Sequence, residues 1–179
     1  MASPAGSTPA ESTLADFNDA PADRARESLR SCNAAVRFVA DMLAGRPYAD
    51  AESLVARAGA VTRGLSWAEV GQALAAHPRI GDRVAGASAE AASSRREQAS
   101  MADADAPTRE AIVAGNRTYE ERFDHVFLIR AAGRSPAEML AELTRRLANP
   151  PEAERVEATE QLAQITELRV RALVAGDPT

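Results

Sequence analysis

The sequence predicts an all-α protein that folds as one helical domain. Of its 179 residues, 45% are hydrophobic but only 4% are aromatic. Much of the apolar content is alanine, which suits close-packed helices better than a β-sheet. Two capping boxes, Ser66–Glu69 and Ser135–Glu138, mark helix starts, because Ser and a Glu three residues later exchange hydrogen bonds with the backbone. The length and the single composition regime indicate one domain.

The first half of the chain alternates a tail, helices and short turns. Residues 1–13 are rich in Ser, Pro, Ala and Thr, so we expect a disordered tail followed by a helical domain over residues 14–176. Residues 33–44 carry apolar side chains at helical spacing and stop before a Gly and a Pro. Residues 51–60 form a shorter amphipathic stretch. The helix that Ser66 opens is ended by a proline at position 78.

The second half is also helical, with one exception. A helix is predicted over residues 88–101, although it lacks large apolar side chains, and another over residues 108–123. The Ser135 box, with Pro at the first helical position, opens a helix that ends near an Asn-Pro pair, and a final helix covers residues 151–175. The bulky, β-prone run HVFLI interrupts this pattern. We therefore expect a short extended segment near residues 125–130 that crosses the core.

Composition excludes several classes of protein. The net charge is −5, which disfavours nucleic-acid binding, and the few aromatic residues are too sparse for base stacking. All 21 basic residues are arginines, so a Schiff-base lysine and a GxxxxGK[ST] phosphate loop are both excluded. The single Cys32 cannot form an internal disulfide, and with only two histidines no structural zinc site is expected.

The sequence shows neither a secretion signal nor a membrane-spanning segment, and the expected cellular location follows from this. The start, MASPAGSTPAEST, has neither a basic region nor an apolar region typical of a secretion signal. No apolar run approaches the ~20 residues needed to span a bilayer. We therefore expect a cytoplasmic protein that does not bind membranes.

Polar residues stand at three places where a plain helical bundle would have apolar or solvent-facing ones. Arg169 interrupts the apolar seam of the last helix, where it either extends its head to solvent, pairs with a carboxylate, or binds a ligand. Ser94, Glu97 and Gln98 share one face of a helix that has no apolar stripe. Their spacing alone favours a solvated face over a pocket wall.

His77 is the third such residue. It ends a helix, where an imidazolium would interact favourably with the helix C-terminus, and a Pro and a Gly follow closely. The alternative is an acid–base imidazole that the Pro-Gly turn holds rigidly. The other histidine, His125, borders the bulky run, so a packed or partly exposed side chain is expected there.

Sequence blocks spread over nearly the whole chain carry a family resemblance. They are FNDAP at 17–21, RPYAD at 46–50, HPRIGDR at 77–83, S-x-x-EQ at 94–98, NRTYEERF at 116–123, VFLIRAAGRSPAEML at 126–140, RLAN at 146–149 and ITELR at 165–169. In this order the blocks resemble the OHCU decarboxylases, the 2-oxo-4-hydroxy-4-carboxy-5-ureidoimidazoline decarboxylases of the ureide pathway.

The resemblance implies an all-α bundle of the OHCU decarboxylase type. Members of that family convert the product of uricase and hydroxyisourate hydrolase into (S)-allantoin, with neither a metal nor an organic cofactor. By matching motifs, the resemblance implies that His77 is the catalytic histidine and that Glu97 and Arg169 belong to the same site. From their chemistry we expect His77 to exchange protons and Arg169 to clamp an oxyanion. Glu97 either orients His77, which is the preferred role, or crowds the leaving carboxylate by like-charge repulsion. The substrate contacts that the resemblance implies are Pro78, Ser94, Arg95, Arg96, Glu97, Gln98, Phe127, Leu128, Ile129, Arg130 and Ala131.

The backbone of the extended segment is expected to matter for the substrate. Helical backbone has already used its donors and acceptors, whereas an extended segment offers free N–H and C=O groups to an amide-rich ring. The family includes dimers, so a homodimer is one assembly that the resemblance allows.

One departure and two rival interpretations remain. The family often has Phe-Gly after the Tyr-containing helix, whereas this chain has Phe123-Asp124-His125, and Asp adopts a positive φ less readily than Gly. One rival is a non-catalytic helical domain that binds ureides. The other is a metal-dependent hydrolase that uses His77, His125 and Glu97, although these lack a typical metal-ligand spacing.

Overall fold

The computed structural model describes residues 13–81 and 89–175, and over these residues the all-α prediction is confirmed. The elements are α1 (Leu14–Asp19), α2 (Ala22–Cys32), α3 (Val36–Ala44), α4 (Ala51–Arg63), α5 (Trp67–Ala75), α6 (Ala89–Glu97), the 3₁₀ helix η1 (Ala99–Asp103), α7 (Ala106–Phe123), α8 (Pro136–Arg146) and α9 (Pro151–Val174).

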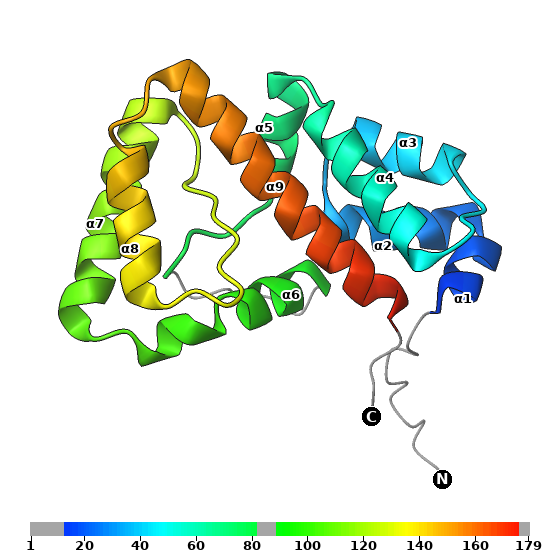
Figure 1. The fold of residues 1–179 in the computed structure, drawn as a ribbon, viewed down its shortest axis with the longest axis horizontal. Helices are drawn as coiled ribbons and strands as arrows, with labels where there is room; N and C mark the ends of the chain where they lie inside the picture. Colours follow the sequence, from blue (N-terminus) through cyan, green and yellow to red (C-terminus); the bar gives the residue numbers. More distant parts are fainter. Residues whose placement is uncertain (1–12, 82–88, 176–179) are drawn as a thin grey trace, which may run out of the picture.

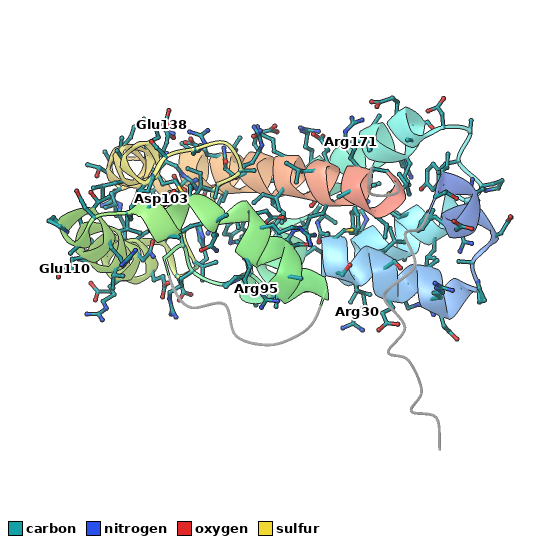
Figure 2. All side chains as sticks on the ribbon, turned by 90° about the horizontal axis from the view of Figure 1, so that it is seen from below. Arg30, Arg95, Asp103, Glu110, Glu138 and Arg171 are labelled. Atoms are coloured by element: carbon teal, nitrogen blue, oxygen red, sulfur yellow. The ribbon has the colours of Figure 1, made fainter. Side chains whose placement is uncertain are left out.

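Helix α9 is the axis of the fold. Figure 1 shows it crossing the molecule between α1–α5 at one end and α7 with α8 at the other. Helix α4 packs along α9, while α7 and α8 pack against each other. Two apolar cores result: the first lies among α1–α5 and α9, and the second lies between α7, α8 and the segment before α8. Charged side chains such as Arg30, Arg95 and Glu138 point outward from the ribbon (Figure 2).

The predicted helix starts depend on local hydrogen bonds that the structure contains. The Ser66 amide donates to Glu69 Oε2 at 2.7 Å, and the Ser135 amide donates to Glu138 Oε2 at 2.7 Å, so both capping boxes are confirmed. Helix α7 begins two residues before the predicted 108, because Asp105 accepts a hydrogen bond from the Thr108 amide at 2.7 Å.

Three further predicted helix boundaries were wrong. Helix α3 begins at Val36 rather than at 33, because the buried Asn33 side chain accepts from the Ala35 amide and donates to Thr166. Helix α4 continues to Arg63, beyond the predicted residue 60. The predicted 88–101 helix is two elements, since α6 ends at Glu97 and η1 follows it. The expected tail residues 1–12, residue 88, residues 82–83 of the HPRIGDR block and residue 176 lie outside the described residues.

The predicted extended segment is confirmed between α7 and α8. The chain is neither helical nor paired in a sheet from residue 126 to 131, and Phe127, Leu128 and Ile129 are buried. Asp124 ends α7 in the left-handed conformation, with φ 59° and ψ 29°. The backbone therefore needs a positive φ at the position where the family pattern has glycine. None of the helices in residues 13–81 and 89–175 is both long and apolar enough to span a bilayer.

Candidate active site

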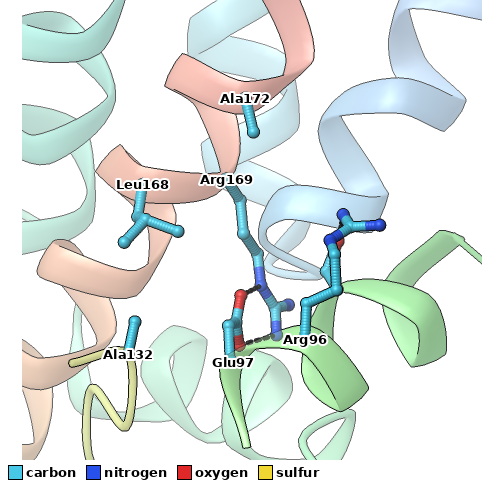
Figure 3. Close-up of a pocket in the computed structure, with 7 residues that line it drawn as sticks. Arg96, Glu97, Ala132, Leu168, Arg169 and Ala172 are labelled. Carbon is cyan, nitrogen blue, oxygen red and sulfur yellow. Dashed lines mark hydrogen bonds and ion pairs between the residues drawn. The ribbon is translucent and has the colours of Figure 1, made fainter. Parts of the chain in front are cut away.

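The centre of the candidate site is an ion pair between α9 and α6. The Arg169 guanidinium donates from Nε to Glu97 Oε1 at 2.7 Å and from Nη2 to Glu97 Oε2 at 2.8 Å (Figure 3). The Arg169 side chain is 3% exposed and the Glu97 side chain 13%. This parallel, two-bond geometry fixes the plane of the guanidinium, which a single contact would leave free to rotate. Of the roles the sequence left open for Arg169, extension into solvent is therefore excluded.

Ser94 joins this pair from the same face of α6. Its Oγ accepts a hydrogen bond from Arg169 Nη2 at 3.1 Å, and the residue is only 2% exposed. The solvated face that the spacing alone favoured is therefore wrong for this side of α6. A helix without an apolar stripe is held here by charged and hydroxyl groups that bond to Arg169, a tertiary partner that helical periodicity does not reveal.

A pocket of about 210 Å³ opens beside the ion pair. Its wall contains Glu97 and Arg169, together with Arg96, which is exposed and donates to Ser93 Oγ at 3.1 Å. This volume accommodates a small organic molecule of several heavy atoms, since one water takes about 30 Å³ of the liquid. The lining residues are Ser93, Arg96, Glu97, Ala132, Leu168, Arg169 and Ala172.

His77 lies two residues beyond α5, in a buried position that is 7% exposed. Its Nδ1 is 2.8 Å from the carbonyl oxygen of Ala73. Since a carbonyl only accepts, Nδ1 carries the proton and donates it, which leaves the lone pair on Nε2 in the neutral ring. Nε2 is buried and forms no hydrogen bond with any residue in the described part of the chain.

The protonation state of His77 follows from its surroundings. Burial, aided by the positive charge of Arg169, lowers the pKa of His77 from 6.5 to about 4. The ring is therefore neutral near pH 7. Its Nδ1–H donates to a carbonyl in the last turn of α5, as the helix-capping interpretation expected. That interpretation assumed a positively charged ring, whereas the neutral ring is the favoured form here.

The expected contact between Glu97 and His77 is replaced by two others. Both carboxylate oxygens of Glu97 accept hydrogen bonds from Arg169, while the Ala73 carbonyl orients the imidazole. The physical reason is local: the Ala73 carbonyl lies one helical turn before His77, in the last turn of α5, and it accepts from the imidazole in addition to the Ala76 amide at 3.1 Å. Glu97 positions the arginine instead.

The turn after His77 is tied to the site by two side chains. Gln98, next to Glu97, accepts a hydrogen bond from the Gly81 amide through Oε1 at 3.2 Å. Gly81 has φ +86°, a conformation that favours glycine. The buried Asn116 of α7 donates to the Ile80 carbonyl at 2.8 Å. Both contacts restrain the segment that carries His77 and Pro78.

The extended segment before the pocket residue Ala132 supplies free backbone groups. The Leu128 carbonyl accepts from Arg146, and the Arg130 amide donates to Gln161. The amides of the neighbouring buried residues Phe127, Leu128 and Ile129 form no hydrogen bond with other described residues. Unsatisfied N–H groups in a buried segment are suited to a ligand that accepts hydrogen bonds.

The remaining candidates for chemistry are placed elsewhere or are inert. Cys32 is buried near Arg169, and burial raises the pKa of its thiol to about 12, so it is not a thiolate nucleophile at neutral pH. His125 packs edge-on against Trp67 and Tyr119, with ring centroids at 5.0 and 5.3 Å. In residues 13–81 and 89–175 no group of three or more His, Cys, Asp or Glu side chains is arranged to hold a metal.

The structure therefore brings together part of the predicted site directly. Ser94, Glu97 and Arg169 form one bonded cluster, and Arg96 lines the same pocket. The other predicted site residues are not among those that line it: His77, Pro78, Gln98, the exposed Arg95, and Phe127, Leu128, Ile129, Arg130 and Ala131. The sequence reasoning missed the following wall residues: Ser93, Ala132, Leu168 and Ala172. A signal existed for the last of these, because it lies three residues beyond Arg169 in the same helix.

Comparisons with known proteins find relatives of this chain. A family model described as OHCU decarboxylase matches residues 18–171. A 2-oxo-4-hydroxy-4-carboxy-5-ureidoimidazoline decarboxylase from Amia calva is 33% identical over 132 residues, which cover 73% of this chain and 75% of that protein.

Two solved structures are similar to this fold. A crystal structure of OHCU decarboxylase in the presence of (S)-allantoin has a TM-score of 0.72 and 25% identity, and the match covers 83% of this chain and 98% of that chain. A crystal structure of (S)-allantoin synthase has a TM-score of 0.69 at 17% identity, covering 91% of this chain and 54% of that one, and supports the fold alone.

Proposed function

This chain belongs to the OHCU decarboxylase family and is a carboxy-lyase of that family, and we propose that it removes CO₂ from 2-oxo-4-hydroxy-4-carboxy-5-ureidoimidazoline to give (S)-allantoin at the pocket between α6 and α9. The observation that carries this proposal is the buried Arg169 guanidinium, held by Glu97 and Ser94 at the wall of a pocket. Such a group is suited to hydrogen-bonding a substrate oxygen that gains negative charge.

Arg169 keeps a donor for the substrate. Its Nε and Nη2 are bonded to Glu97 and Ser94, whereas among the described residues Nη1 makes only a long contact of 3.5 Å, with the Ser31 carbonyl. A ligand oxygen in the pocket competes easily for Nη1, because a hydrogen bond of that length is weak. Glu97 serves as the positioning residue that fixes the direction of this donor.

Arg96 supplies the positive charge that an anionic substrate needs. Glu97 compensates the charge of Arg169. With Arg96 as the second arginine in the wall, the pocket has a net charge of +1. In the described residues Arg96 bonds only to a neutral hydroxyl, that of Ser93. We assign to Arg96 the capture of the substrate carboxylate, by a charge-assisted pair of hydrogen bonds.

His77 is suited to the proton transfers of the reaction. The bond between the ring carbon and the carboxylate breaks, CO₂ leaves, and the electron pair moves into the adjacent C=N system of the substrate, whose nitrogen takes up a proton from solvent. The hydroxyl oxygen then loses its proton and becomes a carbonyl, while the neighbouring ring carbon gains one. The Nε2 lone pair accepts a proton and returns it to one face of that carbon, which sets the handedness of the product.

Other residues complete the binding of the ring. Gln98 uses Oε1 for the Gly81 amide, which leaves its amide nitrogen to donate to a substrate carbonyl. The free amides of residues 127–129 donate to the ureido and ring oxygens. Pro78 holds the turn that follows His77, because its ring fixes φ.

The test follows the formation of allantoin from freshly generated substrate by circular dichroism. Without the enzyme the proton adds equally to both faces of the ring carbon, so the allantoin formed is racemic and gives no signal. The protein should accelerate formation of (S)-allantoin, and His77→Ala should lower kcat by at least ~100-fold, as removal of an acid–base group usually does. The control is His125→Gln, which should retain most activity. A loss of about tenfold or less in His77→Ala would remove His77 from the proposed role.

The same assay separates the rival interpretation. Arg96→Gln should raise KM with little change in kcat, whereas Arg155→Gln should leave both near wild-type values, because Arg155 is paired with Glu152, does not line the pocket and has no assigned contact with the substrate. A protein that binds (S)-allantoin without accelerating its formation would instead be a non-catalytic ureide-binding domain.

A further inference from the structure

A second buried ion pair lies between the ends of α8 and α9. The Arg146 and Glu154 side chains are 1% and 0% exposed, and Arg146 Nε donates to Glu154 Oε1 at 2.9 Å. Tyr119, which is fully buried, donates its hydroxyl to the same carboxylate oxygen. Asn149 donates to the other oxygen, Oε2, at 2.7 Å. None of these residues lines the pocket.

This pair is a poor device for stability alone. Both charges must leave water on folding, and apolar residues of similar volume in such a place often give an equally stable or more stable protein. The more informative contact is therefore the one that Arg146 makes outside the pair.

That contact is with the extended segment. Arg146 Nη1 donates to the Leu128 carbonyl at 2.7 Å, and the guanidinium carbon lies 4.8 Å from the centre of the Phe127 ring. Glu154 and Tyr119 hold the other guanidinium nitrogens, Nε and Nη2, so the direction of Nη1 is fixed. Arg146 thus fixes the position of the carbonyl of Leu128, the middle residue of 127–129.

We propose that Arg146 is a positioning residue for substrate binding: by holding the Leu128 carbonyl, it sets where the free amides on either side of that peptide point. The inference rests on the proposed function, because it assumes that these amides bind the substrate. One further restraint acts downstream, where the Arg130 amide donates to Gln161 Oε1 at 2.9 Å. Between these two points the backbone has few other hydrogen bonds to define its position.

The test removes the anchor without leaving a buried charge. In Arg146→Met/Glu154→Met/Tyr119→Phe all three polar partners become apolar, so the fold should persist. We expect KM and the Kd for (S)-allantoin to rise by about tenfold or more, as loss of a well-directed hydrogen bond would cause, with a smaller change in kcat. The neighbouring Arg145→Met, which removes an exposed arginine paired with Glu142, should change neither value.

A second variant and a second readout keep the proposal falsifiable. The double variant Arg146→Gln/Glu154→Gln retains an uncharged hydrogen-bonded pair. The glutamine side chain at position 146 is too short to reach the Leu128 carbonyl, so this variant should give the same rise in KM. In either folded variant the amides of residues 127–129 should exchange hydrogen about tenfold faster or more, whether or not the protein is active. A folded variant with wild-type exchange at these amides, or with wild-type KM and Kd, would overturn the positioning role. A wild-type protein that neither binds nor forms (S)-allantoin would instead refute the proposed function.

Discussion

The buried, neutral His77 makes the stability of this protein depend on pH in a specific way. In the folded protein the pKa of His77 is lowered to about 4, whereas in the unfolded chain it returns to 6.5. Between these values the unfolded chain binds a proton that the folded protein does not, so acid favours unfolding. The stability that His77 contributes is fully present above pH 6.5 and is lost as the pH falls towards 4.

The magnitude follows from the shift. One pKa unit corresponds to about 1.4 kcal/mol, so the free energy of unfolding should fall by about 2 kcal/mol between pH 6.5 and 5, and by about 3 kcal/mol at pH 4. Urea unfolding curves for the wild type and His77→Gln, measured from pH 4 to pH 8, isolate this contribution. Glutamine still donates to the Ala73 carbonyl but does not titrate, and the carboxylates common to both proteins cancel in the difference.

The comparison has a clear contrary result. If the difference in free energy of unfolding between the two proteins stays constant from pH 8 to pH 4, His77 is not held neutral in the folded state. The Nε2 lone pair, on which the proton transfer depends, would then not be the resting form of the ring.

Three further changes test separate parts of the structure. Glu97→Gln leaves the buried Arg169 charge uncompensated and should lower the free energy of unfolding by about 3 kcal/mol in urea titrations. The control Glu160→Gln removes an exposed partner of Arg63 and should lower it by less than about 1 kcal/mol. Equal losses in the two variants would contradict this account. Asp124→Gly removes the strain of a positive φ at a residue with a side chain and should raise the free energy of unfolding by about 0.5 kcal/mol. A decrease would mean that the contacts of the aspartate side chain stabilise the fold by more than the strained backbone destabilises it. Dialysis against EDTA should leave kcat/KM unchanged, and loss of activity that zinc restores would instead favour the metal-dependent hydrolase.

Much of the fold was predictable because its signals are local. Ser66 and Ser135 stand three residues before a glutamate, and those helix starts need no tertiary information. The break after Glu97 was not predicted. A helix end is usually detected where apolar residues stop recurring at helical spacing, and this segment has no apolar stripe in which such a change could be seen. The extension of α4 to Arg63 was missed although a signal existed: Gly64 directly follows Arg63, a position typical of a helix C-cap, and its amide donates to the Ala60 carbonyl.

The site was predictable only in part. Arg169 was detectable because it interrupts an apolar seam, but its partners Ser94 and Glu97 are more than 70 positions away, and helical spacing alone gave them the wrong environment. The resemblance to a family corrected that interpretation. Arg146 was noted only as the first residue of the RLAN block and was given no role, because a basic residue in the last turn of a helix has an ordinary explanation in the helix dipole.

The most direct test of the central claim is a crystal structure of this protein with (S)-allantoin bound. The account predicts the ligand in the pocket beside Arg169, with an oxygen accepting from Nη1 and with Nε2 of His77 within about 3.5 Å of the ligand, the outer limit of a hydrogen bond. A ligand bound elsewhere, or one that contacts Arg169 while His77 Nε2 stays out of reach, would contradict it.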